Sequence, residues 1–546
     1  MVEKSILLYP QINFMNRLII LMLSFLAFGQ IGNAQVLTES NLPIIVINSN
    51  GEEITDDGKV DATMKIYFKE DGSVNSINDV PNDYDGLIDI KLRGQTSLFL
   101  FDKKSYSLET KNAEGKDSTV NLLDMPKESN WVLHGPFSDK SLMRNALMYT
   151  MADDILTYSP RVQMAEIIVN NDYKGVYLFT EKIKRDDSRV DIAKLKDDDI
   201  TGLDVTGGYI LKFDKADQEE IGWISPYSIS AAQPTNFILE YPDWDDIMPE
   251  QKSYIQNWMT DFENVLASSN FDDPDNGYSK YINVETFIDY MLLNELSKNV
   301  DAYRISTFMY KTKDSDTKLG QLYMGPVWDY NLAFGNADYC EGSEIEGWAY
   351  DFNSVCSDDF FQVHFWWKRL LEDPVFEAEV KEKWMKLRNG KFSNANINAW
   401  IDGFEDQLNG PQARNFQRWP VLGIYVWPNV FIGDTYTEEV DYLRGWLGER
   451  MAWMDQAFDI ELSIESDFTA DQLNISPNPA SDILILKGDL VIDKMNFEIL
   501  GLEGKTFISG TLNSESTIQI NRLPKGTFIL LLNNGEKTYA QKFVKI

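Results

Sequence analysis

The sequence predicts an α+β protein, in which a strand-rich N-terminal half is followed by a helical half and then by a small β-sandwich. Three observations lead to this prediction. Alternating apolar and polar residues dominate as far as residue 215, helical spacing of apolar residues begins at Val284, and short alternating runs return after residue 471 between turns rich in Pro, Asn and Gly. At 546 residues the chain is long enough for more than one domain.

The composition describes a globular and strongly acidic protein. Hydrophobic residues make up 43% of the chain and aromatic residues 13%, while 86 acidic against 50 basic residues give a formal net charge of −36. This balance excludes the basic surface of a nucleic-acid-binding protein. A well-solvated surface is enough to explain the acidity, whereas an anionic substrate near that surface would need a divalent metal to screen it.

The first 34 residues have the features of a signal peptide. Arg17 precedes an apolar run from Leu18 to Phe28, and small residues stand before Gln35, where cleavage would occur. The apolar run is too short to favour a membrane span. No later stretch combines the length and apolarity of a transmembrane helix, so we expect the mature chain to be exported without a transmembrane span.

Strands and turns are expected for most of the N-terminal half, with one helix at residues 139–156 that begins at Ser138 or Asp139. The Asn-Asn-Asp turn at residues 170–172 should join two of the strands. The segment 221–279 shows few clear periodicities, and we expect an insertion or a substrate-facing loop region there. The expected strands lie at residues 43–47, 63–68, 86–94, 103–108, 164–171, 175–192 and 207–215.

Helices are expected for the second half. Apolar residues at helical spacing predict a helix over residues 284–299, with Asn283 as its N-cap. Further helices are expected within residues 363–390 and 437–458, where we assign the tryptophans to the core. A β-hairpin should fill part of the segment between the first and second of these helices.

Two aspartates stand at the two ends of that hairpin. Asp301 follows the helix, and Asp329 follows the hairpin, 28 residues later. Two carboxylates placed in this way can share one metal-phosphate site, as the base and the metal ligand of kinase-type enzymes do. A carboxylate bound to a metal is a poor base, so the two roles need two residues. The alternative is a capping Asp301 and a turn Asp329 with no chemical role.

Five sequence blocks carry a family resemblance. They are RGQTS with KKSYSLET, SLMRNALMY, GVYLFTEKIKRDDSRVDI, GGYILKFDK, and NVDAYRISTFMYK with GPVWDYNLAFGN. In this order they resemble the spore-coat protein H (CotH) kinase-like family over about residues 40–460. The resemblance implies a divergent protein-kinase fold with two lobes, a strand-rich N-lobe and a helical C-lobe. It also implies the use of ATP with Mg²⁺ or Mn²⁺.

The resemblance assigns roles to the two aspartates. Asp301 matches the family's catalytic aspartate, the base for an acceptor hydroxyl, and Asp329 matches its metal-binding aspartate. Protein kinases place an asparagine five residues after the catalytic aspartate, whereas this chain has Ser306. We therefore expect Asn331 to supply the second metal contact. The chain has no DFG glycine and no GxGxxG loop, so the RGQTS turn would have to cover the phosphates.

Five further residues are candidates for binding the nucleotide. Lys104 is the candidate phosphate-contacting lysine, because it follows the RGQTS turn, and Lys103 is the alternative. Arg93 would contact phosphate or else pair with nearby acids. Glu181 at the end of YLFTE would line the nucleotide site, as would its neighbour Lys182, or both would be solvated.

The C-terminal segment resembles a second family. SPNPASDIL, LPKGTFILLL and the final KFVKI are similar to the type IX secretion sorting domain of Bacteroidota. This resemblance implies an immunoglobulin-like sandwich over residues 470–546, recognition by the type IX secretion machinery, and passage across the outer membrane after Sec export to the periplasm. In such an oxidising setting Cys340 and Cys356 would form a disulfide or remain free.

Together the two resemblances imply a secreted or cell-surface atypical kinase. It would transfer the ATP γ-phosphate to hydroxyls of exported proteins or, less readily, of glycans. The alternative is a catalytically weak surface scaffold or glycan-binding protein on the same fold, which would use the many tryptophans and tyrosines of the helical half.

Overall fold

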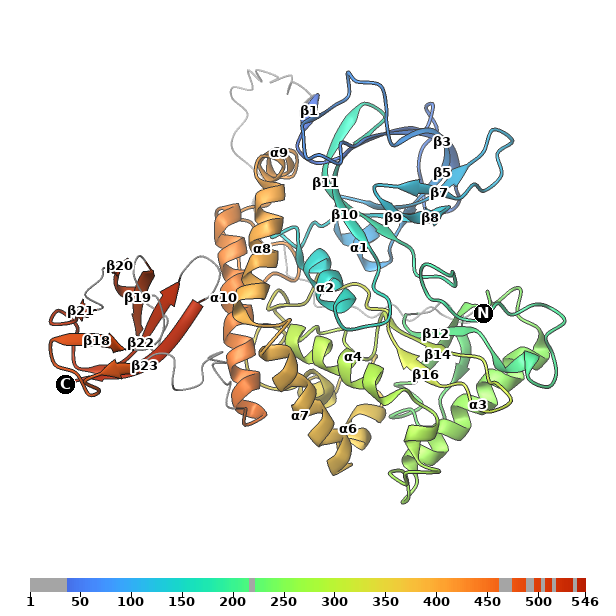
Figure 1. The fold of residues 1–546 in the computed structure, drawn as a ribbon. Helices are drawn as coiled ribbons and strands as arrows, with labels where there is room; N and C mark the ends of the chain where they lie inside the picture. The colour runs from blue at the N-terminus through green and yellow to red at the C-terminus, as the bar shows by residue number, and fades with distance from the viewer. Residues whose placement is uncertain are drawn as a thin grey trace, which may run out of the picture.

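The computed structural model describes residues 37–215, 221–460, 474–487, 495–501, 506–512, 517–533 and 538–546. The predicted signal peptide, residues 1–34, lies outside the described residues. Within them the chain has mixed α and β content, with strands dominating the N-terminal part and helices following (Figure 1). The C-terminal part is again built of strands.

Seven strands of the N-terminal part form a closed barrel. The barrel order is β10-β11-β9-β6-β5-β3-β2, and every pair is antiparallel except β10 with β2. Alternate residues point inward, and Ile45, Ile88, Trp131 and other apolar side chains form the buried interior. The strands are β2 (Ile44–Asn48), β3 (Val60–Tyr67), β5 (Tyr84–Arg93), β6 (Ser105–Lys111), β9 (Asn130–His134), β10 (Val162–Val169) and β11 (Asp172–Glu181).

These bounds confirm the predicted strands within one to a few residues, apart from the long prediction for residues 175–192. β11 ends at Glu181, and the chain leaves the barrel there without regular structure as far as residue 192. Asn170 and Asn171 both have positive φ, as a two-residue hairpin turn requires. Short additional strands are β1 (Glu39–Ser40), β4 (Asn75–Ser76), β7 (Val120–Leu122) and β8 (Met125–Glu128).

A second sheet lies on the other side of the molecule's centre from the barrel, with helix α3 against it (Figure 1). Its order is β13-β14-β12-β15-β16, and all its pairs are antiparallel. The hairpin expected before Asp329 is β15 with β16. The elements are β12 (Tyr209–Phe213), β13 (Ile221–Ile224), β14 (Asn236–Tyr241), α3 (Pro249–Ala267), β15 (Thr307–Lys311) and β16 (Leu322–Met324).

The segment 221–279 is therefore mostly regular, contrary to the expectation of loops. The helix α3 begins at Pro249, a residue favoured in the first turn, and buries only one face, with Ile255, Met259 and Phe262. Polar residues interrupt that apolar spacing, which hid the helix in the sequence. β13 and β14 extend the second sheet, and α3 packs beside it, with Tyr254 stacked on Tyr209 of β12.

Helices build the rest of the main body around a large apolar core, and its tryptophans Trp366, Trp367 and Trp384 are buried as expected. Asn283 accepts a hydrogen bond from the Thr286 N–H and caps α4. The helix predicted from Asp139 begins later, although the Asp139 carboxylate accepts from the Arg144 N–H. The helices are α1 (Thr96–Leu100), α2 (Arg144–Asp153), α4 (Val284–Ser297), α5 (Phe352–Val355), α6 (Trp366–Leu370), α7 (Pro374–Arg388), α8 (Asn394–Leu408), α9 (Pro411–Arg418) and α10 (Tyr436–Ala457).

The described C-terminal residues form two antiparallel sheets that share one apolar core, with Leu484, Ile499 and Leu530 fully buried. One sheet has the order β17-β18-β21 and the other β20-β19-β22-β23. The strands are β17 (Asn474–Ser476), β18 (Ile483–Lys487), β19 (Asn496–Gly501), β20 (Thr506–Thr511), β21 (Thr517–Gln519), β22 (Gly526–Asn533) and β23 (Thr538–Lys545).

Candidate functional site

A cavity of about 820 Å³ lies between the barrel and the rest of the main body, which is within the usual size of small-molecule sites. One wall of the cavity is formed by the outer face of the barrel strands β5, β6, β9 and β11. Because side chains alternate along a strand, the residues opposite the apolar interior all point into the cavity. These residues are Lys91, Arg93, Ser105, Ser107, Glu109, Asn130, Val132, His134, Leu178, Thr180 and Lys182.

The RGQTS turn closes one side of this cavity. Gly94 has a φ of +113°, and a Cβ built on it would lie 2.2 Å from the Ser97 Oγ, so only glycine fits there. The turn leads directly into α1, which extends from the barrel toward the centre of the molecule (Figure 1). Residues 93–98 all line the cavity.

Asp301 reaches the cavity from the loop after α4. Lys298 ends α4 in a left-handed conformation, which turns the chain toward the barrel. The Asp301 N–H donates to the Asn299 Oδ1 (3.2 Å), and its carboxylate Oδ1 accepts from the Arg304 guanidinium (3.1 Å). The Asn299 Nδ2 donates to the Asp329 carbonyl oxygen (3.4 Å), so one amide side chain ties the two aspartate segments together.

Asp329 is held by α2 and has a strained backbone. Its φ is +66°, in the left-handed region that few non-glycine residues adopt. The Asp329 N–H donates to the Tyr149 hydroxyl (3.4 Å), and the next N–H, of Tyr330, donates to the Asn145 Oδ1 (2.6 Å). Two side chains of α2 therefore fix the peptide groups on either side of the Asp329 Cα.

The charges around Asp329 make its ionisation costly. Burial raises the pKa of Asp329 to about 6, and the nearby Asp301 carboxylate adds to this shift. Arg93 lowers the pKa, Asp214 raises it again, and Lys215 opposes the rise. Asp301, Asp329, Asp214 and Asn331 line one cavity. The site is thus rich in oxygen ligands and has more negative charge than Arg93 neutralises.

This donor set resembles the protein part of a magnesium site rather than a complete metal cage. Within the described ranges, no group of three or more His, Cys, Asp or Glu side chains is arranged to hold a metal ion. Mg²⁺ usually binds one or two carboxylates and completes its shell with water and substrate phosphates. Asp329 with the Asn331 amide oxygen therefore fits such an ion.

Among the predicted cationic residues, Arg93 is one whose charge lowers the pKa of Asp329. Its guanidinium lies over the Trp328 ring, 5.2 Å from the centroid, and Trp328 in turn stacks on Tyr149. Burial lowers the pKa of Arg93, although the negative charge of Asp329 raises it. No other described residue forms a hydrogen bond or ion pair with the guanidinium, so its N–H donors are available to a ligand in the cavity.

Two residues of the site were missed in the sequence. Asp214 and Lys215 follow β12 directly and line the cavity. Burial raises the pKa of Asp214, and the Lys215 Nζ donates to the Thr96 Oγ1 at the end of the RGQTS turn (3.3 Å). The charged pair after an apolar strand, in the block GGYILKFDK, was the pattern that could have indicated them.

Lys103 and Lys104 lie outside the cavity lining. The Lys103 Nζ is buried and donates to the Pro136 carbonyl (3.2 Å), the Val176 carbonyl (2.5 Å) and the Asn415 Oδ1 (2.8 Å). Burial lowers its pKa well below the usual value. The Lys104 Nζ donates to the Leu98 and Phe101 carbonyls (2.7 and 2.6 Å), so it stabilises the end of α1.

Glu181 is also committed to protein partners. It is fully buried, accepts from the Tyr158 hydroxyl (3.0 Å) and from Arg161 (3.0 Å), and lies 3.6 Å from the Arg189 guanidinium. It does not line the cavity, whereas its neighbour Lys182 does.

Comparison with known proteins agrees with the two resemblances. Residues 90–454 match the family described as CotH kinase protein, and residues 474–546 match the secretion system C-terminal sorting domain. A search of curated proteins gave no match. The sorting domain implies an interaction with the type IX secretion machinery and delivery to the cell surface or the medium. In the part of the chain that the structure describes, no helix is long and apolar enough to cross a bilayer.

The first of these matches covers more than half of the chain, including the RGQTS turn, Asp301 and Asp329. The chain therefore belongs to the CotH kinase family and carries a secretion sorting domain at its C-terminal end.

Proposed function

We propose that the protein is an atypical kinase, secreted or held at the cell surface, that transfers the γ-phosphate of ATP to hydroxyls of exported proteins. The observation that carries this proposal is the shared cavity of Asp301, Asp329 and Arg93, in which neighbouring acidic charge and burial raise the pKa of Asp329 to about 6. A site of this kind favours a ligand that combines a cation with an anionic group.

We propose a two-lobed arrangement for residues 40–460. The barrel with α1 is the N-lobe, the second sheet and the helices form the C-lobe, and the nucleotide lies in the cavity between them. The described fold supports this division, because the cavity is roofed by barrel strands and floored by residues of the second sheet and the aspartate loops. Residues 470–546 are then a separate, immunoglobulin-like sorting domain, with two sheets around one core.

Asp329 and Asn331 would hold Mg²⁺ or Mn²⁺. When bound, the metal screens the charge of the phosphates and of the developing transition state. Arg93, whose N–H donors have no partner among the described residues, would donate to phosphate oxygens, and Lys215 stands on the same side of the cavity. The RGQTS turn would exclude water from the phosphates. Lys103, Lys104 and Glu181 remain candidates only through rearrangement of their present contacts.

Asp301 would act as the base. Its Oδ1 accepts from Arg304, while Oδ2 has no hydrogen-bond partner among the described residues and can accept the proton of an acceptor hydroxyl. The Asp301 side chain is 15% exposed, so it is accessible from the cavity. Arg304 fixes the orientation of the carboxylate without blocking both oxygens.

The exported acceptor follows from the proposed route of this protein. A signal peptide over residues 1–34 would direct the chain to the periplasm, and the sorting domain would direct it across the outer membrane. Acceptor proteins that are exported by the same route would meet the kinase at every stage of export. Phosphorylation in the periplasm, before the last step of export, is the stage at which a nucleotide donor is nearest.

The test uses the purified protein with labelled ATP and either Mg²⁺ or Mn²⁺. We expect phosphate incorporation into the protein itself or into an added acceptor, and its loss in Asp301→Asn and Asp329→Asn. Calorimetry should show that Asp301→Asn still binds the metal nucleotide, whereas Asp329→Asn binds it weakly. Failure of the wild-type protein to bind nucleotide with either metal would contradict the proposal.

A surface scaffold that binds glycans is the second candidate. Trp427 stacks on Tyr339 at the edge of the cavity with an interplanar angle of 14°, and 38% of Trp427 is exposed. An aromatic pair of this kind, with Trp427 exposed and Tyr339 half-buried, can hold a sugar ring. Titration with oligosaccharides, followed by the fluorescence of Trp427 against a Trp427→Ala control, would favour this candidate if sugar binds and nucleotide does not.

A further inference from the structure

Arg304 connects Asp301 to a loop that lies outside the cavity. Its side chain is 2% exposed, and its Nε donates to the Val300 carbonyl oxygen (2.8 Å). One terminal nitrogen donates to the Asp301 Oδ1 (3.1 Å), and the other donates to the Asp359 Oδ1 (3.0 Å). The guanidinium also lies 4.0 Å from the centre of the Phe352 ring. The nitrogen that donates to Asp359 also donates to the Phe361 carbonyl oxygen (3.1 Å), so the position of Arg304 depends on the turn that carries Asp359 and Phe361.

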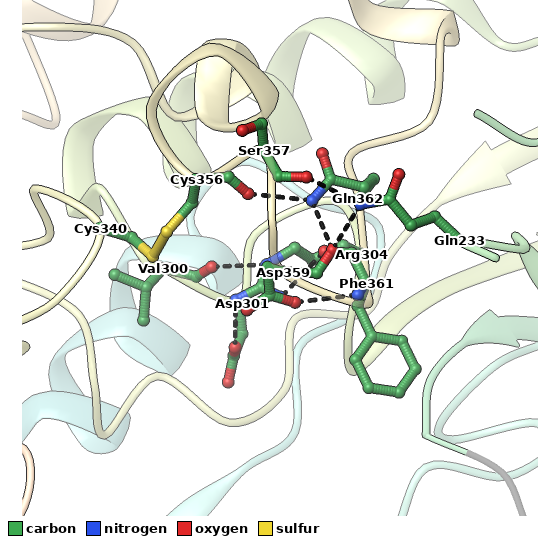
Figure 2. The surroundings of a disulfide bond; sticks show 10 residues. All are labelled: Gln233, Val300, Asp301, Arg304, Cys340, Cys356, Ser357, Asp359, Phe361 and Gln362. Carbon is green, nitrogen blue, oxygen red and sulfur yellow. Dashed lines mark hydrogen bonds and ion pairs between the residues drawn. A yellow bond between two sulfur atoms is a disulfide. The ribbon is translucent and has the colours of Figure 1, made fainter. Parts of the chain in front are cut away.

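Asp359 belongs to a compact turn that begins at Cys356. The Asp359 N–H donates to the Cys356 carbonyl oxygen (3.1 Å), and the Gln362 Nε2 donates to the Cys356 and Asp359 carbonyls (3.0 and 2.7 Å). The Asp359 Oδ1 accepts from the Phe361 N–H as well (2.8 Å). The turn is therefore built on Cys356, as Figure 2 shows.

A disulfide joins Cys356 to Cys340, with the two Cα atoms 5.5 Å apart. Cys340 follows Tyr339, which lines the cavity and lies close enough to Asp301 for that carboxylate to raise its pKa, after the larger effect of burial. The disulfide thus links the loop of Cys340 to the loop of Cys356 beside Asp301 (Figure 2). Tyr339 belongs to the first loop and Asp359 to the second. The disulfide is the one covalent connection between the two loops besides the chain itself.

We infer that the Cys340–Cys356 disulfide, acting through Asp359 and Arg304, positions the Asp301 carboxylate, so that the site reaches its active geometry only after oxidation. This inference rests on the proposed function. Arg304 and Asp359 are positioning residues, because neither they nor the two cysteines line the cavity. Their effect should therefore fall on the reaction step and not on nucleotide binding.

The oxidation step needs an electron acceptor of the disulfide class. The thiols of Cys340 and Cys356 give up two protons and two electrons, the S–S bond forms, and a disulfide of the oxidant becomes two thiols. Such oxidants act beyond the inner membrane, and the reducing cytosol keeps thiols free. The chain would then be inactive where it is made and active after export, which limits phosphorylation to exported acceptors.

The experiment compares the oxidised full-length protein with the same protein after treatment with dithiothreitol, and with the double variant Cys340→Ser/Cys356→Ser. The chain contains two cysteines and both are in this bond, so the reductant has one target in the protein. Three quantities are measured: the phosphotransfer rate, the ATP dissociation constant, and hydrogen exchange of the amides of residues 298–306 and of strand β3.

We expect the rate to fall by about tenfold or more, since small misplacements of a catalytic group have effects of this size. The ATP dissociation constant should change by less than about twofold, because the disulfide and its partners do not line the cavity. Exchange should become faster in residues 298–306 and stay unchanged in β3. Asp359→Ala should reproduce the loss of rate, and Asp359→Asn, which keeps an acceptor oxygen, should restore most of it.

Other results have distinct meanings. Unchanged rate and unchanged exchange after reduction would overturn the inference, as would faster exchange throughout the barrel, which would indicate general destabilisation. If the oxidised protein transfers no phosphate but exchange in residues 298–306 still responds to reduction alone, the proposed function fails and the positioning of Asp301 by the disulfide stands.

Discussion

Replacing Asp329 by asparagine should make the ligand-free protein more stable while abolishing its activity. Burial and the acidic neighbours raise the pKa of Asp329 from 3.8 to about 6. The folded protein therefore binds this proton more tightly than the unfolded chain does, and its free energy of unfolding decreases as the pH rises through this range. A shift of about two units corresponds to roughly 3 kcal/mol once the carboxyl is ionised.

The asparagine side chain removes the free-energy cost of the ionised carboxylate and loses few other interactions. No described residue donates a hydrogen bond to the Asp329 carboxylate, and the two N–H contacts of the segment come from the backbone. We expect Asp329→Asn to raise the free energy of unfolding by up to about 3 kcal/mol at pH 8. At pH 5, where the wild-type carboxyl is largely protonated in the folded state, the gain should be about half as large.

Urea unfolding followed by tryptophan fluorescence measures this difference. All fourteen tryptophans lie between Trp131 and Trp453, so the signal reports on the main body and not on the sorting domain. Asp316→Asn, an exposed aspartate between β15 and β16, is the matched control and should change stability little at either pH. A wild-type protein that is as stable as Asp329→Asn at pH 8, or more stable, would refute the electrostatic reasoning. Mg²⁺ with ATP should then stabilise the wild type and not the variant.

Three further substitutions separate the roles of the cationic and buried residues. Arg93→Gln removes the positive charge that lowers the pKa of Asp329. The acid limb of the pH–activity profile should therefore move to higher pH, and ATP should bind more weakly. An acid limb at the wild-type pH would contradict this. Glu181→Gln leaves Arg189 buried without its anionic partner and should cost about 3–5 kcal/mol in urea unfolding, with an unchanged ATP dissociation constant. Lys103→Met should likewise change stability and not ATP affinity in calorimetry, because its three acceptors are protein oxygens; a large loss of affinity would restore its assignment to the nucleotide site.

Local patterns predicted the fold well where one face of an element is buried. The barrel strands alternate clearly, and α4 shows both an N-cap at Asn283 and continuous helical spacing. The helix α3 was missed because polar residues interrupt its apolar face, and α8 and α9 were not predicted. Residues 363–390, where helical structure was expected, form the two helices α6 and α7, since Asp373 caps a new start at Pro374.

The lining of the cavity was predicted in part, for a reason that lies in the fold. Asp301, Asp329, Asn331 and Arg93 do line one cavity, because the sequence blocks that carry them end helices and strands at the same place. The lysines before β6 and Glu181 were chosen by their distance along the chain from the RGQTS turn and YLFTE. Whether such a side chain faces the cavity or a backbone carbonyl depends on tertiary packing, which spacing alone does not contain.

The charge of the cavity argues for a ligand that carries both signs. The chain has a net charge of −36, yet the cavity is lined by six cationic and six acidic side chains. The cationic ones are Lys59, Lys91, Arg93, Lys182, Lys212 and Lys215, and the acidic ones are Asp56, Glu109, Asp214, Glu240, Asp301 and Asp329. Basic residues are thus concentrated in the cavity relative to the whole chain. The carboxylates of Asp301 and Asp214 nevertheless raise the pKa of Asp329. A purely anionic ligand would meet that acidic cluster and a lone cation would meet Arg93, so a nucleotide with its metal satisfies both halves of the site at once.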